Sequence, residues 1–106
     1  MKIIIIEDHP AIYHTISQTI ENITTDAIIS YHEKWEPALE EIKKSPPDFV
    51  ITDIQIRSYK QLEIPTACME NKIPCMVYTG HVNYTILKHC NNLKVNVIVS
   101  KLAKLS

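Results

Sequence analysis

The N-terminal segment MKIIIIEDHP constrains the fold more than any other part of the chain. Its isoleucines form a continuous apolar, β-branched run over Lys2–Ile6, which predicts a strand covered on both faces, as in a parallel sheet. The run ends on Glu7 and Asp8, and Pro10 then favours the first turn of a helix, where its missing N–H costs nothing. Two adjacent carboxylates at a strand end repel each other, so this arrangement requires a compensating partner.

Strand-like and helix-like segments alternate along the rest of the chain. The expected strands are Lys2–Ile6, Ala27–Tyr31, Phe49–Thr52, Cys75–Tyr78 and Val95–Val99. Four helices are expected between them. The first carries the apolar stripe Ile12, Ile16, Ile20 and Ile23, and the second runs from about Pro37 to Lys44. The third begins near Pro65, and the fourth contains Ile86, Leu87 and Cys90. This alternation predicts βαβ units, and therefore one α/β domain over residues 1–106 whose doubly wound parallel sheet has helices on both faces.

Composition and charge argue against several classes of function. The net charge of −1 gives no basic surface for direct nucleic-acid binding by this domain. The cysteines (Cys68, Cys75, Cys90) are odd in number and contain no CxxC pair, which favours free thiols in a reducing compartment. The N-terminus lacks a signal-peptide pattern, and IIII is far too short to span a bilayer. We therefore expect a cytoplasmic protein with no membrane partner.

Chemically active side chains follow all but one of the expected strands. Glu7 and Asp8 follow the first, Asp53 the third, Thr79 the fourth and Lys101 the fifth. Because ligands of open α/β sheets bind outside the carboxyl ends of the strands, these side chains are expected to meet in one cleft. Clustered carboxylates favour a divalent cation, and hard oxygen ligands favour Mg²⁺. A carboxylate beside such a metal can attack a phosphoryl group, whose charge a hydroxyl and an ammonium help to neutralise.

Short motifs occur at these strand ends in the order IIIIEDHP, FVITD, VYTGH and VSK. Together they resemble the receiver domain of two-component response regulators over essentially the whole chain. The EDHP opening is most similar to receivers that precede a LuxR-type helix-turn-helix DNA-binding domain. The resemblance implies a flavodoxin-like, three-layer fold around a five-stranded parallel sheet in the order 2-1-3-4-5. It implies a signalling domain rather than an enzyme, with a sensor histidine kinase as phosphodonor and any DNA-binding output domain outside this chain.

The resemblance also implies a metal-assisted phosphoacceptor site. Asp53 is expected to accept the phosphoryl group. Glu7, Asp8 and Asp53 are expected to hold Mg²⁺, directly or through water, together with the backbone carbonyl of Gln55. The like charges at the end of the first strand would then be explained by the cation that they share.

Further residues are expected to act on the phosphoryl group after its transfer. By resemblance, Thr79 would hydrogen-bond it and Lys101 would pair with one of its oxygens. Gly80 stands where the family requires a small residue that leaves the phosphate room. The side chains of Gln55 and His81 occupy positions expected to modulate the lifetime of the phosphoaspartate.

Departures from the family pattern bear on the switch. The loop after Asp53, IQIRSYKQLEIP, lacks the usual proline-glycine pattern, so the third helix is expected to be short or displaced. Ile98 stands three residues before Lys101, where family members usually carry Tyr or Phe, so the usual aromatic rotation is not available. Few residues follow Lys101, and the fifth helix is expected to be truncated or missing. Sheet surface left uncovered would favour a homodimer.

Two alternatives remain open. One is a pseudo-receiver that keeps the fold as an interaction or dimerisation module and does not depend on phosphorylation. Ile98, the atypical loop after Asp53 and the short C-terminal end support it, whereas the complete set of strand-end residues opposes it. The other is a Mg²⁺-dependent phosphatase of a different α/β fold, which usually carries a second aspartate two residues after its nucleophile. That position is Gln55 here, which argues against turnover hydrolysis.

The histidines show no zinc-ligand spacing such as HExxH. His9, next to the two acids, is expected to be a helix-start residue rather than a metal ligand. The sequence therefore predicts oxygen ligands at the strand ends.

Overall fold

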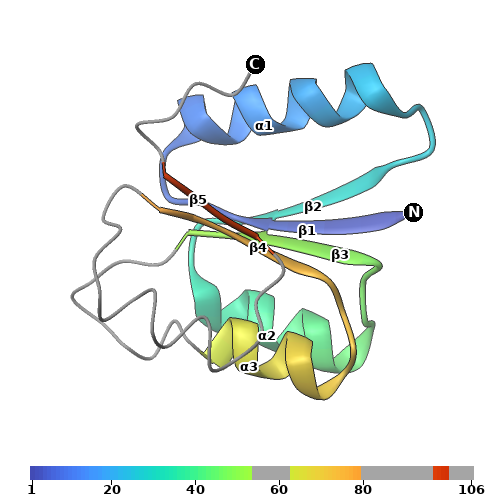
Figure 1. Ribbon diagram of the computed structural model, residues 1–106, viewed down its shortest axis with the longest axis vertical. Helices are drawn as coiled ribbons and strands as arrows, with labels where there is room; N and C mark the ends of the chain where they lie inside the picture. The colour runs from blue at the N-terminus through green and yellow to red at the C-terminus, as the bar shows by residue number, and fades with distance from the viewer. Residues whose placement is uncertain (54–62, 80–96, 101–106) are drawn as a thin grey trace.

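The regular elements alternate between strands and helices, as the sequence predicts (Figure 1). The computed structural model describes residues 1–53, 63–79 and 97–100. For residues 78–79 and 97–100 it describes only the backbone. The elements are β1 (Lys2–Ile6), α1 (Pro10–Ile23), β2 (Ile28–His32), α2 (Trp35–Lys44), β3 (Phe49–Thr52), α3 (Glu63–Glu70), β4 (Cys75–Thr79) and β5 (Val97–Ser100).

The strands form one parallel sheet in the order β2-β1-β3-β4-β5. Helix α1 covers one face of this sheet, and α2 and α3 cover the other (Figure 1). The flavodoxin-like, doubly wound architecture and its strand order are therefore confirmed. The predicted helix around Ile86, Leu87 and Cys90 and the fifth helix after Lys101 lie outside the described residues.

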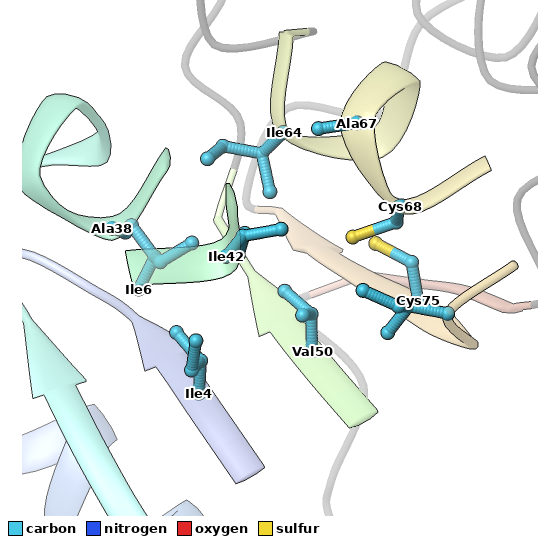
Figure 2. Packing of buried hydrophobic residues seen from close by; sticks show 10 residues of the cluster. Ile4, Ile6, Ala38, Ile42, Val50, Ile64, Ala67, Cys68 and Cys75 are labelled. Atoms are coloured by element: carbon cyan, nitrogen blue, oxygen red, sulfur yellow. The ribbon is translucent and has the colours of Figure 1, made fainter. Parts of the chain in front are cut away.

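The isoleucines of β1 divide the core between the two faces of the sheet, because successive side chains of a strand point to opposite sides. Ile4 and Ile6 pack on the side of α2 and α3, where they meet Ile42 and Val50 (Figure 2). Ile3 and Ile5 pack on the side of α1, with Ile16 and Ile51. All four isoleucines of β1 are buried, as expected for a strand covered on both faces.

Helix α1 buries most of its predicted stripe. Ile16 is buried, and Ile12 and Ile20 pack against the same cluster. Ile23 was predicted wrongly, because its side chain is 79% exposed. At 14 residues the helix is about 21 Å long, whereas the five-residue strand β1 spans about 17 Å. The last turn of α1 therefore has no sheet left to cover.

Some element boundaries differ from the prediction by one or two residues. Strand β2 begins at Ile28 rather than at Ala27, and α2 begins at Trp35 rather than near Pro37. Helix α3 begins at Glu63, two residues before Pro65. The prolines lie inside the first turn of their helices, where backbone N–H groups have no intrahelical acceptor.

None of the described helices is long and apolar enough to cross a membrane.

A polar cluster joins α2 to the start of β1 and to β2. The Lys2 ammonium lies 2.8 Å from Glu41 Oε2. Glu41 Oε1 accepts hydrogen bonds from the Ser30 hydroxyl and interacts with His32 Nε2, each at 2.6 Å. Burial by itself raises the pKa of Glu41, but the hydrogen bonds from Lys2, Ser30 and His32 and the charge of Lys2 lower it, from its ordinary value of 4.5 to about 2.

We expect Ile42→Ala to destabilise the fold by about 2 to 4 kcal/mol, because the fully buried side chain leaves a cavity between α2 and the sheet. Urea unfolding followed by circular dichroism measures the change. Ile23→Ala is the matched control, because its side chain is exposed at the end of α1, and it should change the free energy of unfolding by less than about 0.5 kcal/mol. Equal losses in both variants would contradict the assigned core.

We expect Glu41 to contribute about 1 to 2 kcal/mol of stability that depends on pH. Its pKa is lower in the folded state than in the unfolded chain, so the contribution is present above pH 4.5 and is lost as the pH falls toward 2. Urea unfolding of wild type and Glu41→Gln should therefore differ most at pH 5 and least near pH 2.5. Glu40→Gln, at an exposed position of the same helix, is the control and should follow the wild type. A gap between wild type and Glu41→Gln that does not change with pH would contradict the assignment.

Candidate functional site

The carboxyl ends of β1 and β3 bring Glu7 and Asp53 to the same level of the sheet. Ile6 of β1 pairs with Thr52 of β3, so the next residue on each strand is Glu7 and Asp53. The Asp53 N–H donates to the Ile6 carbonyl at 2.9 Å, and this bond extends the pairing by one step beyond the strands. Adjacent strands lie about 4.8 Å apart. The predicted convergence of these two residues at one edge of the sheet is therefore present.

The acidic residues at this edge differ in their exposure. Glu7 is 1% exposed and Asp53 is 8% exposed, whereas the side chain of Asp8 is 38% exposed. Charged carboxylates are rarely buried unless they are compensated. Two buried acids and a third on the adjacent surface therefore form a set that favours a cation arriving from the solvent side.

Strand β2 supports Glu7 through contacts that the sequence analysis did not identify. The Glu7 N–H donates to the His32 carbonyl at 3.0 Å, and the Tyr31 hydroxyl donates to the Glu7 carbonyl at 2.7 Å. The ring of Tyr31 stacks on Tyr13 of α1, with centroids 4.0 Å apart. Burial raises the pKa of Tyr31, and the negative charges of Glu33 and Glu7 raise it further. The hydroxyl is therefore held in its neutral form, which can donate to the backbone of Glu7.

His9 is the N-terminal cap residue of α1, as the sequence predicts, but its imidazole does not cap the helix. Its N–H donates to Glu7 Oε1 at 3.1 Å, and its carbonyl accepts from the backbone N–H groups of Ile12 and Tyr13, both at 3.1 Å. The imidazole instead approaches Asp8, with Nε2 at 3.8 Å from Oδ1. The backbone of His9 is thus fixed, while its side chain faces the acids.

Among the described residues, the side chains whose metal-ligating atoms all lie within 4.8 Å of one another are Glu7, Asp8 and His9. Asp53 does not belong to that group, although its backbone is bonded to Ile6 at the same edge. The carboxylates are hard oxygen donors and suit Mg²⁺ or Mn²⁺. The carboxylates of Glu7 and Asp8 therefore have the donor chemistry that a divalent cation requires.

The remaining predicted residues are only partly described. Thr79 ends β4 and pairs with Ser100 of β5, so its backbone lies at the carboxyl edge of the sheet. Ile98 lies in β5 opposite Val77. The other predicted site residues, Gln55, Gly80, His81 and Lys101, lie outside the described residues.

Residues 3–106 match the family model described as "Response regulator receiver domain". A comparison with curated protein sequences gives no significant match.

The fold is similar to several solved structures of response regulators. The Mn²⁺-bound form of response regulator Rcp1 aligns with a TM-score of 0.85 at 17% identity, over 98% of this chain and 83% of that chain. A phosphorylated cyanobacterial phytochrome response regulator, RcpA, aligns with a TM-score of 0.83 at 22% identity, over 98% of this chain and 82% of that chain. A LuxR-family DNA-binding response regulator from Staphylococcus aureus aligns with a TM-score of 0.81 at 21% identity, over 97% of this chain and 88% of that chain. At these identities the similarity shows the fold.

The match covers nearly the whole sequence, and the acids at the ends of β1 and β3 stand where the resemblance of their motifs places them. The chain belongs to the response regulator receiver domain family, whose members are signalling domains.

Proposed function

We propose that this domain is a phosphorylation switch in which Asp53 accepts a phosphoryl group from a sensor histidine kinase in the presence of Mg²⁺. The observation that carries the proposal is the convergence of Glu7 and Asp53, both buried, on one edge of the sheet beside Asp8. A domain used only as a scaffold gains nothing from clustered like charges. A phosphoacceptor needs them to hold the cation that the reaction requires.

In the proposed transfer one O–P bond forms and one P–N bond breaks. A carboxylate oxygen of Asp53 attacks the phosphorus of the donor phosphohistidine, the P–N bond breaks, and the imidazole of the kinase leaves with a proton from solvent. An acyl phosphate remains on Asp53 until water hydrolyses it to the carboxylate and inorganic phosphate. A bound Mg²⁺ supplies positive charge that offsets the charge on the phosphoryl oxygens. Glu7 and Asp8 would hold that ion beside Asp53, with the backbone carbonyl of Gln55 as a further ligand.

The resemblance of the strand-end motifs to the family supports the remaining roles. Thr79 would hydrogen-bond the phosphoryl group after its transfer, and Lys101 would pair with one of its oxygens. Gly80 would leave the group room, and the side chains of Gln55 and His81 would influence the access of hydrolytic water.

The output of the switch would be a shift between two conformations that changes dimerisation or an attached domain. The EDHP motif and the similarity to a LuxR-family DNA-binding response regulator support a DNA-binding output domain outside this chain, in a cytoplasmic pathway of transcription regulation. The Mn²⁺-bound neighbour supports a divalent cation at the site. Because Ile98 replaces the usual aromatic residue, the signal would pass through the backbone of the loop after Thr79.

A second candidate is the pseudo-receiver, which binds partners without phosphorylation. The group of mutually close ligand atoms among the described residues favours it, because that group contains His9 and not Asp53. The two candidates differ in one property that can be measured, the formation of a covalent adduct on Asp53.

We expect incubation with acetyl phosphate and Mg²⁺ to add one phosphoryl group to the wild type, detected by intact-mass spectrometry. The adduct should be absent when Mg²⁺ is chelated and absent in Asp53→Asn, because the amide is not a nucleophile toward phosphorus. Asp26→Asn is the control, since Asp26 lies in the exposed turn between α1 and β2, and it should retain the full adduct.

Circular dichroism of each variant shows that it is folded before the comparison is made. A folded wild type that gives no adduct with acetyl phosphate or phosphoramidate would refute the switch and leave the pseudo-receiver. An adduct that persists in Asp53→Asn would show that another residue is the acceptor.

A further inference from the structure

The side chain of His9 has no structural task among the described residues that accounts for its position. It is the N-cap of α1 but makes no side-chain capping bond, and it is 64% exposed. The backbone of His9 is held by three hydrogen bonds. Its N–H donates to Glu7 Oε1, and its carbonyl accepts two from the first turn of α1. From that fixed backbone the ring, although exposed, places Nε2 3.8 Å from Asp8 Oδ1.

The distances between His9 and the acids suit a shared metal ion. Ligands bound at about 2.1 Å in an octahedral sphere lie about 3.0 Å apart when adjacent and about 4.2 Å apart when opposite. His9 Nε2 lies 3.8 Å from Asp8 Oδ1, within that range and too far for a hydrogen bond. The ligand atoms of Glu7, Asp8 and His9 all lie within 4.8 Å of one another. Small rotations of the exposed Asp8 and His9 side chains toward the buried Glu7 would close the set around one ion.

We propose that His9 donates an imidazole nitrogen to the divalent cation held by Glu7 and Asp8, and that this site therefore prefers transition-metal ions to Mg²⁺. The inference rests on the metal site of the proposed function and adds a ligand to it. Mg²⁺ prefers oxygen and keeps its waters, so a nitrogen donor contributes little to its binding. Imidazole binding strengthens along the series from Mn²⁺ through Co²⁺ to Ni²⁺.

The chemistry at Asp53 does not require this nitrogen. Mn²⁺ has the same charge as Mg²⁺ and accepts carboxylate and carbonyl oxygens, so either ion can offset phosphoryl charge. The consequence of His9 is selectivity, because the metal content of the site would follow the supply of transition-metal ions and not that of Mg²⁺ alone. The same contact would hold the first turn of α1 against the site when the metal is bound.

The first measurement is the affinity of the wild type, His9→Ala and His14→Ala for Mg²⁺, Mn²⁺ and Co²⁺, by isothermal titration calorimetry at pH 7.5. His14 is exposed on α1, so His14→Ala removes an imidazole that does not belong to the group of Glu7, Asp8 and His9. We expect His9→Ala to lose about tenfold in Co²⁺ affinity, less in Mn²⁺ affinity and under about twofold in Mg²⁺ affinity. His14→Ala should match the wild type for every metal.

The second measurement is electron spin-echo envelope modulation of bound Mn²⁺, which detects a directly coordinated imidazole nitrogen. The nitrogen modulation should be present in the wild type and in His14→Ala and absent in His9→Ala. Equal losses for all metals in His9→Ala, or a Mn²⁺ complex of the wild type without nitrogen modulation, would overturn the inference. Phosphorylation of Asp53 with Mg²⁺ would then still stand, whereas failure of every variant to bind any metal would overturn the proposed function as well.

Discussion

The pairing of β1 with β2 on one side and β3 on the other is the constraint on which the rest of the structure depends. β1 is bonded along both edges and covered on both faces, and its central residues Ile4 and Ile5 are fully buried. Its register fixes which residues follow the strands at the carboxyl edge. A slip of one residue would exchange the two faces of β1, so core packing and site geometry are set by the same hydrogen bonds.

Much of this architecture could be predicted because the signals in the sequence are local. β1, β3 and the start of α1 at Pro10 lie where the sequence predicts them, since unbroken β-branched runs and a proline at the first helical position are strong patterns. The starts of α2 and α3 were placed too late because Pro37 and Pro65 were taken as first residues. Proline is tolerated throughout the first turn, so it marks the beginning of a helix only to within that turn.

The parts of the site that escaped prediction depend on three-dimensional placement. The acids after β1 and β3 could be brought together from the rule that ligands bind at the carboxyl ends of parallel strands. The bond from Tyr31 to the Glu7 carbonyl could not, because it depends on the register of β2 and on stacking against Tyr13. His9 was taken for a helix-start residue, and it is one. The proximity of its ring to Asp8, on which the proposed ligand role rests, is visible only in three dimensions.

The charged side chains at the two ends of β1 differ in their partners. At one end a carboxylate pairs with a cationic side chain of the protein, and at the other end carboxylates lie beside one another. At the start of β1, the Lys2 ammonium lies 2.8 Å from Glu41 Oε2 and lowers the pKa of that carboxyl, so this ion pair contributes to stability whether or not a ligand is present. At its other end, carboxylates gather beside one another on a rigid edge. A cation that binds the folded state alone stabilises it in proportion to the logarithm of its concentration over its dissociation constant. If the proposed cation binds there, the stability of the domain would respond to the cation's concentration, which a purely structural ion pair does not do.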